Sequence, residues 1–207
     1  MQYRTLGKTG LLVSEIAMGC EGFTDKSQQE VTQMVDALQA GGINCIDLYT
    51  SNPQVRSCLG QALLGRREKF VLQGHLCTIW QDEQYKRTRN MEEVKEGFQD
   101  LLCRLGTDYL DIGMIHYVDA LDDWEKVVQG PVFAYARSLK EAGVIRHIGL
   151  SSHNPTVARK AVESGLIEVL LFSINPCYDL MPATENVEDL FAPENYQTPR
   201  LNMDPER

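Results

Sequence analysis

The chain has 207 residues, a formal net charge of −9 and 43% hydrophobic residues. This hydrophobic content is sufficient for one globular core, and the acidic balance argues against a nucleic-acid-binding protein, which would carry a basic face. No run approaches the ~20 apolar residues of a membrane span, and no signal sequence with a basic start and an apolar stretch opens the chain. We therefore expect a soluble, cytoplasmic protein that binds neither nucleic acid nor membrane.

The opening residues 3–13, with Gly7 and Gly10 at turn positions, predict a small β-hairpin. Six apolar runs follow it, and they are nearly continuous rather than alternating, which is typical of parallel strands buried on both faces. These runs cover residues 16–18, 43–49, 70–72, 110–116, 144–150 and 169–174.

Amphipathic stretches separate the predicted strands. Apolar residues recur at helical spacing between residues 31 and 38 and again between residues 91 and 105. Asn154 followed by Pro155 predicts the start of a helix, whereas Gly130-Pro131 predicts a break or kink inside another. Glycines that cap helices in the left-handed region are expected where each helix turns into the next strand.

The repeated order of strand and helix predicts an α/β fold of the (β/α)8 TIM-barrel type. The barrel would be incomplete, because about six of the eight units are found. We assign residues 1–182 to this partial barrel and residues 183–207 to a polar, acidic tail. The simplest interpretation is the N-terminal part of a longer, truncated barrel. The alternative is a natural short form whose edge strands are covered by its own tail or by a second chain.

Asp47 and His116 end two of the predicted strands, where parallel α/β proteins place their chemistry. A carboxylate at that point can orient a base or bind a ribose hydroxyl, but it can also cap a helix. A histidine there suits hydrogen bonding to a carbonyl or acid–base chemistry near neutral pH, although a core histidine is the competing interpretation.

Four further polar side chains map to the same edge of the predicted sheet. His75 follows the third strand, and Tyr49 lies two residues beyond Asp47, so it should share the side of the strand that Asp47 occupies. Ser151 and Ser152 follow the fifth strand, where they can bind an amide-bearing ligand or act only as capping groups.

Several segments, in order over residues 1–182, resemble the aldo-keto reductases: RTLGKTGLLVS, GINCIDLY, IHYVD and LSSHNP. The resemblance implies a (β/α)8 barrel and NADPH-dependent reduction of a small-molecule carbonyl substrate. It also implies that Asp47 and His116 correspond to the catalytic aspartate and histidine of the family. Ser151 and Ser152 would then hydrogen-bond the carboxamide of the nicotinamide.

This sequence departs from the family pattern at three places. The family's catalytic tyrosine falls on Asn52, its lysine falls on His75, and its carboxamide-binding glutamine falls on Leu171 or Phe172. A lysine beside a tyrosine lowers the pKa of the phenol, so loss of both changes how a proton can be supplied. The main cofactor-phosphate contacts of the family follow the seventh and eighth strands, which these residues lack.

We therefore expect an NAD(P)H-dependent oxidoreductase with an altered proton donor. Tyr49 or His75 would replace the missing tyrosine, Asp47 would orient the donor, and His116 would hold the substrate oxygen. The 207 residues alone are expected to be inactive.

Two other functions stay open at this point. A barrel that has lost the tyrosine and the lysine can bind a nucleotide without turnover, as a redox sensor or an interaction module. Asp47, His75 and His116 could instead hold zinc or iron in a metal-dependent enzyme. The words DLYTSNPQVRS and QGHL are similar to a divergent bacterial branch of the family, some of whose members carry a C-terminal iron–sulfur extension, which would lie beyond these residues. The substrate, the choice between NADPH and NADH, and the oligomeric state are not fixed by the sequence.

Overall fold

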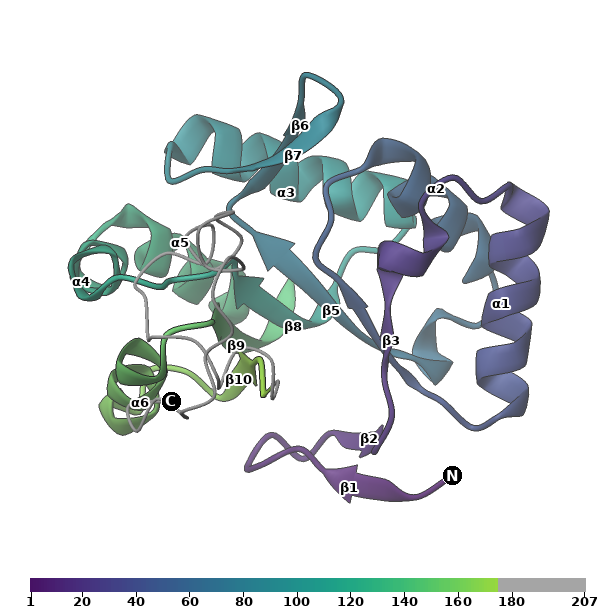
Figure 1. The fold of residues 1–207 in the computed structure, drawn as a ribbon, viewed down its shortest axis with the longest axis horizontal. Coiled ribbons are helices and arrows are strands. Elements are labelled where there is room, and N and C mark those ends of the chain that lie inside the picture. Colours follow the sequence, from purple (N-terminus) through teal and green to yellow (C-terminus); the bar gives the residue numbers. More distant parts are fainter. Residues whose placement is uncertain (175–207) are drawn as a thin grey trace, which may run out of the picture.

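The computed structural model describes residues 1–174, which form a half-barrel of six parallel strands with helices on its outer face (Figure 1). The spatial order of the strands is β10-β9-β8-β5-β4-β3, so strands that follow one another in the barrel sequence are also neighbours. The six strands are β3 (Met18–Gly19), β4 (Cys45–Leu48), β5 (Val71–Leu76), β8 (Leu110–Ile115), β9 (Ile145–Ser152) and β10 (Val169–Phe172).

The helices lie between these strands in the chain. They are α1 (Gln28–Ala40), α2 (Pro53–Ala62), α3 (Met91–Leu105), α4 (Leu121–Gln129), α5 (Pro131–Glu141) and α6 (Pro155–Ser164), with short 3-10 turns η1 (Cys20–Phe23) and η2 (Arg67–Lys69). Every pairing within the six-stranded sheet is parallel. The prediction of an incomplete (β/α)8 architecture is confirmed. The last residues of the predicted barrel and the predicted tail at 183–207 lie outside the described residues.

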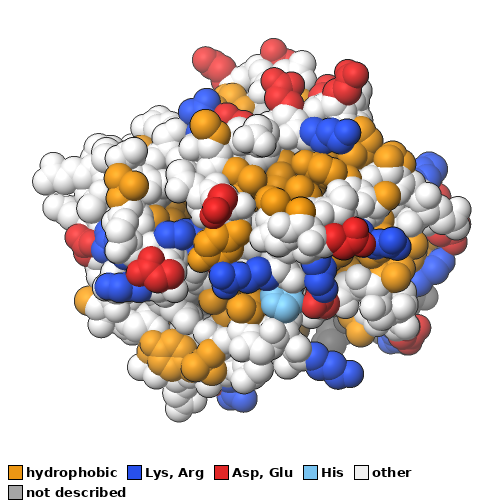
Figure 2. Space-filling model, turned by 180° about the vertical axis from the view of Figure 1, so that it is seen from behind, with side chains coloured by type: hydrophobic (Ala, Val, Ile, Leu, Met, Phe, Trp, Pro, Cys, Tyr) orange, Lys and Arg blue, Asp and Glu red, His pale blue; other side chains and the backbone are white. Residues whose placement is uncertain are grey.

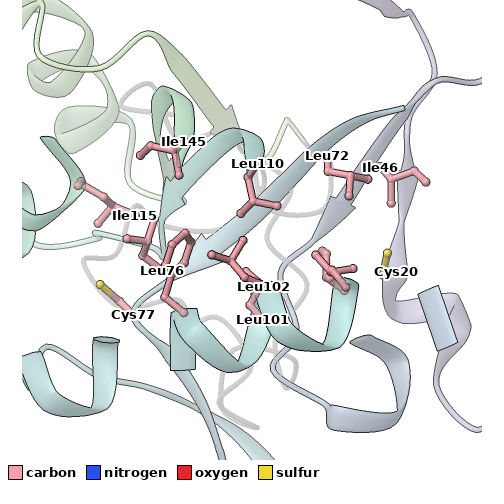
Figure 3. Close-up of a cluster of buried hydrophobic side chains, with 14 of the residues drawn as sticks. Cys20, Ile46, Leu72, Leu76, Cys77, Leu101, Leu102, Leu110, Ile115 and Ile145 are labelled. Carbon is pink, nitrogen blue, oxygen red and sulfur yellow. The ribbon is translucent and has the colours of Figure 1, made fainter. Parts of the chain in front are cut away.

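Alternate residues of each strand face the two sides of the sheet. The outward set, which includes Ile46, Leu72 and Leu76, packs against the helices in the main hydrophobic core. Figure 3 shows Ile46, Leu72 and Leu76 in this cluster, with Leu76 beside Leu101 and Leu102 of α3. The inward set of β4 and β5 is polar near the carboxyl ends, and this set forms the site described below.

The predicted hairpin at the amino terminus is confirmed as β1 (Tyr3–Thr5) paired with β2 (Leu12–Ser14). Its loop packs Leu6 and Leu11 against an inward-facing cluster of Ile112, Met114 and Val169. The hairpin therefore covers the amino ends of the strands, which leaves the carboxyl ends as the open end of the half-barrel.

All six strands differ from their predicted ranges by at least one residue: β4 covers Cys45–Leu48 instead of residues 43–49, β8 ends at Ile115 instead of residue 116, and β10 ends at Phe172 instead of residue 174. β5 continues to Leu76 instead of stopping at residue 72, β9 continues to Ser152 instead of residue 150, and the first strand covers Met18–Gly19 instead of residues 16–18. The reason in β5 and β9 is that their last residues are buried although they are polar or small, as His75 at 2% exposure illustrates. A search for apolar runs stops too early at such positions.

The Gly130-Pro131 pair breaks the predicted helix into α4 and α5, as expected. Proline has no N–H to continue the hydrogen-bond ladder of α4, and a Cβ on Gly130 would lie 2.3 Å from the carbonyl oxygen of Lys126. Asn154 caps α6 through hydrogen bonds that its Oδ1 accepts from two backbone N–H groups. Both signals acted as the sequence predicted.

A second hairpin, β6 (Thr78–Gln81) and β7 (Gln84–Arg87), was not predicted. Its two-residue turn holds Asp82 and Glu83 at φ values of 52° and 60°, which only turn-forming residues adopt readily. The sequence lacks the Asn-Gly or Asp-Gly pair that marks such turns. The hairpin follows the carboxyl end of β5 directly and projects beyond that end of the sheet (Figure 1).

The surface shows basic side chains interspersed with acidic ones over the face seen in Figure 2, without a continuous basic surface there. Within residues 1–174, no helix is both long and apolar enough to cross a membrane. The five described cysteines carry free thiols; Cys20, Cys58 and Cys77 are buried, and Cys103 is exposed.

Candidate active site

A cavity of about 540 Å³ lies at the carboxyl ends of the strands. Polar and aromatic side chains from six segments of the chain converge on it. They are Glu21, Asp47, Tyr49, His75, Tyr85, His116, Tyr117, Ser151, Ser152 and His153, with Leu171 and Phe172 at one side. All the predicted site residues therefore line a single cavity.

Asp47 and His75 are joined across neighbouring strands. The register of β4 and β5 pairs Asp47 with Gln73, which places His75 two residues further along β5 on the same face. Asp47 Oδ1 lies 3.0 Å from His75 Nε2, and the same oxygen accepts a hydrogen bond of 2.9 Å from Gln73 Nε2. The aspartate thus faces an imidazole, at the position to which the resemblance assigns the family's lysine.

His75 also contacts His116. The two Nδ1 atoms lie 2.7 Å apart, which is a hydrogen bond between the rings. Burial, followed by the electrostatic effects of His75, Arg89, His153 and Arg87, holds the pKa of His116 well below its usual 6.5. His116 is therefore a neutral imidazole at physiological pH, and its Nε2 atom is buried without a hydrogen-bond partner among the described residues.

Tyr49 follows directly after β4 and lines the same cavity as Asp47, as the two-residue spacing predicted. Its ring stacks on His116 at 6.5 Å between centroids. Burial, followed by the negative charge of Glu21, raises the pKa of Tyr49 to about 12. The phenol consequently keeps its proton throughout the physiological range, and it is a weaker acid than a free tyrosine.

Three aromatic lining residues escaped the sequence analysis. Tyr85 on β7 packs edge-on against His116 at 5.7 Å, Tyr117 follows at 5.0 Å, and His153 packs against Tyr117 at 5.5 Å. The enrichment of Thr, Ile, Trp and Tyr between residues 78 and 87 signals strands, and it would have located Tyr85. The site is consequently surrounded by rings.

The two predicted serines differ in their bonding. Ser152 Oγ donates to Val118 O at 2.7 Å and accepts from the backbone N–H of Asn154 at 3.2 Å, so its hydroxyl is engaged within the protein. Ser151 Oγ is buried and has no hydrogen-bond partner within the described part of the chain. Of the pair, Ser151 is the one whose hydroxyl can still form a hydrogen bond to a ligand.

Asn52, Leu171 and Phe172 stand at the other departures from the family pattern, and they differ in whether they line the cavity. Asn52 does not line the cavity, because its Oδ1 caps α2 through the backbone N–H groups of Gln54 at 2.9 Å and Val55 at 3.2 Å. Leu171 and Phe172 line the cavity with apolar side chains, which cannot replace an amide. Asn52 is therefore engaged in capping α2 and lies outside the cavity lining.

The geometry gives little support to a metal centre on Asp47, His75 and His116. Both ring nitrogens of His75 are engaged, one with Asp47 and the other with His116, so the three groups form a line rather than converge on one point. A metal site needs several donors around a common centre. Among residues 1–174, no group of three or more histidine, cysteine or acidic side chains is arranged to hold a metal ion.

Comparison with known proteins identifies the family of the chain. The sequence model of the "Aldo/keto reductase family" matches residues 15–191. The chain is 27% identical to the uncharacterized oxidoreductase YqkF of Bacillus subtilis (strain 168), over 83% of this chain and 56% of that protein. It is 26% identical to the NADH-specific methylglyoxal reductase of Escherichia coli (strain K12), over 80% of this chain and 54% of that protein.

The fold matches as well. The holo form of the aldo-keto reductase AKR11C1 from Bacillus halodurans superposes with a TM-score of 0.71 at 28% identity, over 84% of this chain and 58% of that chain. The chain spans about half the length of the curated relatives it matches.

Proposed function

Because the chain belongs to the aldo/keto reductase family, we propose that it is an NAD(P)H-dependent oxidoreductase that interconverts a small carbonyl compound and its alcohol. The observation that carries the proposal is the single cavity shared by Asp47, His75 and His116. The chain covers about half the length of its relatives. The proposed activity therefore refers to the whole protein.

One observation supports binding of the nicotinamide end of a dinucleotide in the cavity. Ser151 lines the cavity, and its Oγ is buried and lacks a partner among the described residues. A carboxamide supplies both a donor and an acceptor that can satisfy a hydroxyl. Asp47 has a side chain that is 22% exposed, and it can accept a hydrogen bond from a ribose hydroxyl. When bound, the nicotinamide supplies or accepts the hydride.

His116 holds the substrate oxygen in this proposal. His116 lines the cavity and its Nε2 atom is buried without a partner among the described residues. A hydroxyl or carbonyl oxygen bonded to this atom would satisfy a buried polar group, which costs about 1–3 kcal/mol when unsatisfied. The proton donor is not the usual tyrosine, because Asn52 occupies that position. The choice of NADPH over NADH follows the family resemblance.

The test uses this 207-residue chain and the protein encoded by the complete reading frame that contains it. Binding of NADPH and NADH is measured by calorimetry. The absorbance of reduced nicotinamide is then followed with a panel of aldehydes and ketones, and in the reverse direction with their alcohols. Hydride transfer to any member supports the proposal. Dinucleotide binding without turnover on the panel favours the redox sensor instead, and an absence of binding in both proteins rules out the proposal.

A further inference from the structure

The hydrogen bonds that connect Asp47, His75 and His116 fix where the protons lie. A carboxylate can only accept, so His75 Nε2 carries the hydrogen that bonds to Asp47 Oδ1 at 3.0 Å. Gln73 Nε2 donates to the same oxygen at 2.9 Å, which is the pattern of an ionised carboxylate. His75 Nδ1 then bears a lone pair in the neutral ring.

The orientation of the second bond follows from the first. Because His75 Nδ1 can only accept, the 2.7 Å bond between the two Nδ1 atoms has its hydrogen on His116. The neutral His116 ring therefore has Nδ1–H and a bare Nε2. That bare Nε2 is the buried atom without a partner in the described residues, and His116 borders the cavity.

We infer that His116 Nε2 exchanges a proton with the substrate oxygen and that His116 Nδ1 passes a proton to His75. The two histidines thus act as a relay in place of the tyrosine and the lysine. The inference rests on the proposed function and names the proton path of the same site. His116 is then a catalytic residue, and His75 and Asp47 are positioning residues that act through it.

The step balances in the direction of alcohol oxidation. The substrate O–H bond breaks and an N–H bond forms at His116 Nε2, while the carbon loses hydride to the oxidised nicotinamide dinucleotide of the proposed function. The His116 Nδ1–H bond breaks and an N–H bond forms at His75 Nδ1. His75 becomes an imidazolium beside the Asp47 carboxylate, and His116 is neutral again with its hydrogen on Nε2. Carbonyl reduction follows the same path in reverse.

The surrounding charges favour one mobile proton on the pair, held by His75. Asp47 from β4 stabilises the positive charge on His75, whereas Arg87, Arg89 and His153 face His116 and oppose a charge there. Two charged rings at 2.7 Å would also repel each other in a buried site. The proton that enters at His116 therefore moves on to His75.

The first test is independent of turnover. The chain has four histidines, and nitrogen NMR of labelled imidazoles reports which ring nitrogen carries a hydrogen. At neutral pH we expect His75 as the Nε2–H tautomer and His116 as the rarer Nδ1–H tautomer. Resonances are assigned with single His→Gln variants. H147Q is the control, because His147 is bonded to Glu168 and does not line the cavity. The opposite tautomers at the pair would overturn the relay.

The second test uses H75Q. Glutamine can donate to Asp47 and accept from His116, so it keeps the hydrogen bonds, but it cannot take up a proton. We expect kcat to fall at least tenfold, with little change in the KM for the dinucleotide. The limb of the pH–rate profile that depends on proton uptake by His75 should be lost, while His116 should keep the Nδ1–H tautomer. H147Q should leave kcat unchanged.

The two failures are distinguishable. Unchanged kcat and pH profile in H75Q, with active wild-type protein, would overturn the relay and leave the proposed function standing. Dinucleotide binding with no turnover by wild-type protein on any carbonyl or alcohol would overturn both, whatever the tautomers.

Discussion

Asp47 and His75 lie on adjacent parallel strands with Oδ1 of the carboxylate 3.0 Å from Nε2 of the imidazole. The exposed fraction of the His75 side chain is 1%, against 22% for Asp47. An imidazole at this place keeps the pairing of a carboxylate with a nitrogen base that the family pattern implies. It also adds an acceptor nitrogen on the far side of the ring, which a lysine does not have.

The first prediction concerns the change Asp47→Asn. The amide can still accept from His75 Nε2, but it no longer stabilises an imidazolium at that position. We expect kcat to fall by about 10- to 100-fold, a part of what general acid–base catalysis contributes, with the fold intact by circular dichroism. Asp36→Asn is the matched control, because Asp36 is 58% exposed and pairs with Arg66 on the outer surface. Equal kcat in the two variants would remove Asp47 from the mechanism.

The second prediction separates the two neighbouring serines. Ser151→Ala removes a buried hydroxyl that has no partner among the described residues, so it should not lower the free energy of unfolding. It should weaken dinucleotide binding about tenfold, equivalent to ~1.4 kcal/mol. Ser152→Ala removes the hydroxyl that donates to Val118 O, so it should lower the free energy of unfolding by about 1 kcal/mol. Calorimetric titration and urea denaturation of both variants check the contrast. The reverse pattern would assign the carboxamide contact to Ser152.

The sequence predicted the polar end of the half-barrel better than the contacts within it. Strand ends are legible because apolar runs stop there, and this placed Asp47, His116 and Tyr49 at one edge of the sheet. The bond between His75 and His116 was not predictable, because the two residues are 41 positions apart and the His116 ring packs against Tyr85, which lies on the unpredicted hairpin.

The β6–β7 hairpin illustrates a second limit. Its turn places Asp82 and Glu83 at positive φ, and neither residue is a strong predictor of that conformation. Tertiary contacts thus decide the turn, and with it the position of Tyr85 beside the site. Turn chemistry alone identifies a hairpin only where glycine or asparagine is present.

The third prediction concerns Arg56, which is 1% exposed in α2. Its guanidinium donates to Thr50 O at 3.2 Å, to Gly97 O at 3.0 Å and to Asp100 at 2.9 Å. Arg56→Met would leave two carbonyl oxygens without this donor, and we expect the free energy of unfolding to fall by about 3 kcal/mol.

Asp100→Asn is the comparison for Arg56. Asp100 is 36% exposed and can be rehydrated, so its change should cost less than about 1 kcal/mol. Urea denaturation of both variants measures the difference. A cost for Asp100→Asn as large as that for Arg56→Met would show that the ion pair, rather than the two carbonyl contacts, holds the loop after β4.

The fourth prediction is a pH dependence of stability. Burial lowers the pKa of His116 well below 6.5 in the folded protein, so the unfolded chain binds more protons than the folded protein below that pH. Stability is therefore present above pH 6.5 and is lost as the pH falls toward the folded pKa, with a slope of up to about 1.4 kcal/mol per pH unit for one group. Urea denaturation at a series of pH values should show a shallower slope for His116→Gln than for the wild-type protein. Identical slopes would contradict the buried neutral state of His116.

The last prediction tests whether Tyr49 or His116 exchanges the proton with the substrate oxygen. The pKa of Tyr49 is raised to about 12 by burial and by Glu21, so the phenol is poorly suited to exchange a proton near neutral pH. Phenylalanine preserves the stacking of the ring on His116, and Tyr49→Phe should therefore change kcat by less than about threefold. His116→Gln removes the exchanging nitrogen and should lower kcat by about 100-fold or more, within the range that general acid–base catalysis contributes. Steady-state rates of both variants, measured with the substrate that turns over best, decide between the two residues. A loss in Tyr49→Phe as large as that in His116→Gln would assign the proton to the phenol, with the histidine pair serving to orient it.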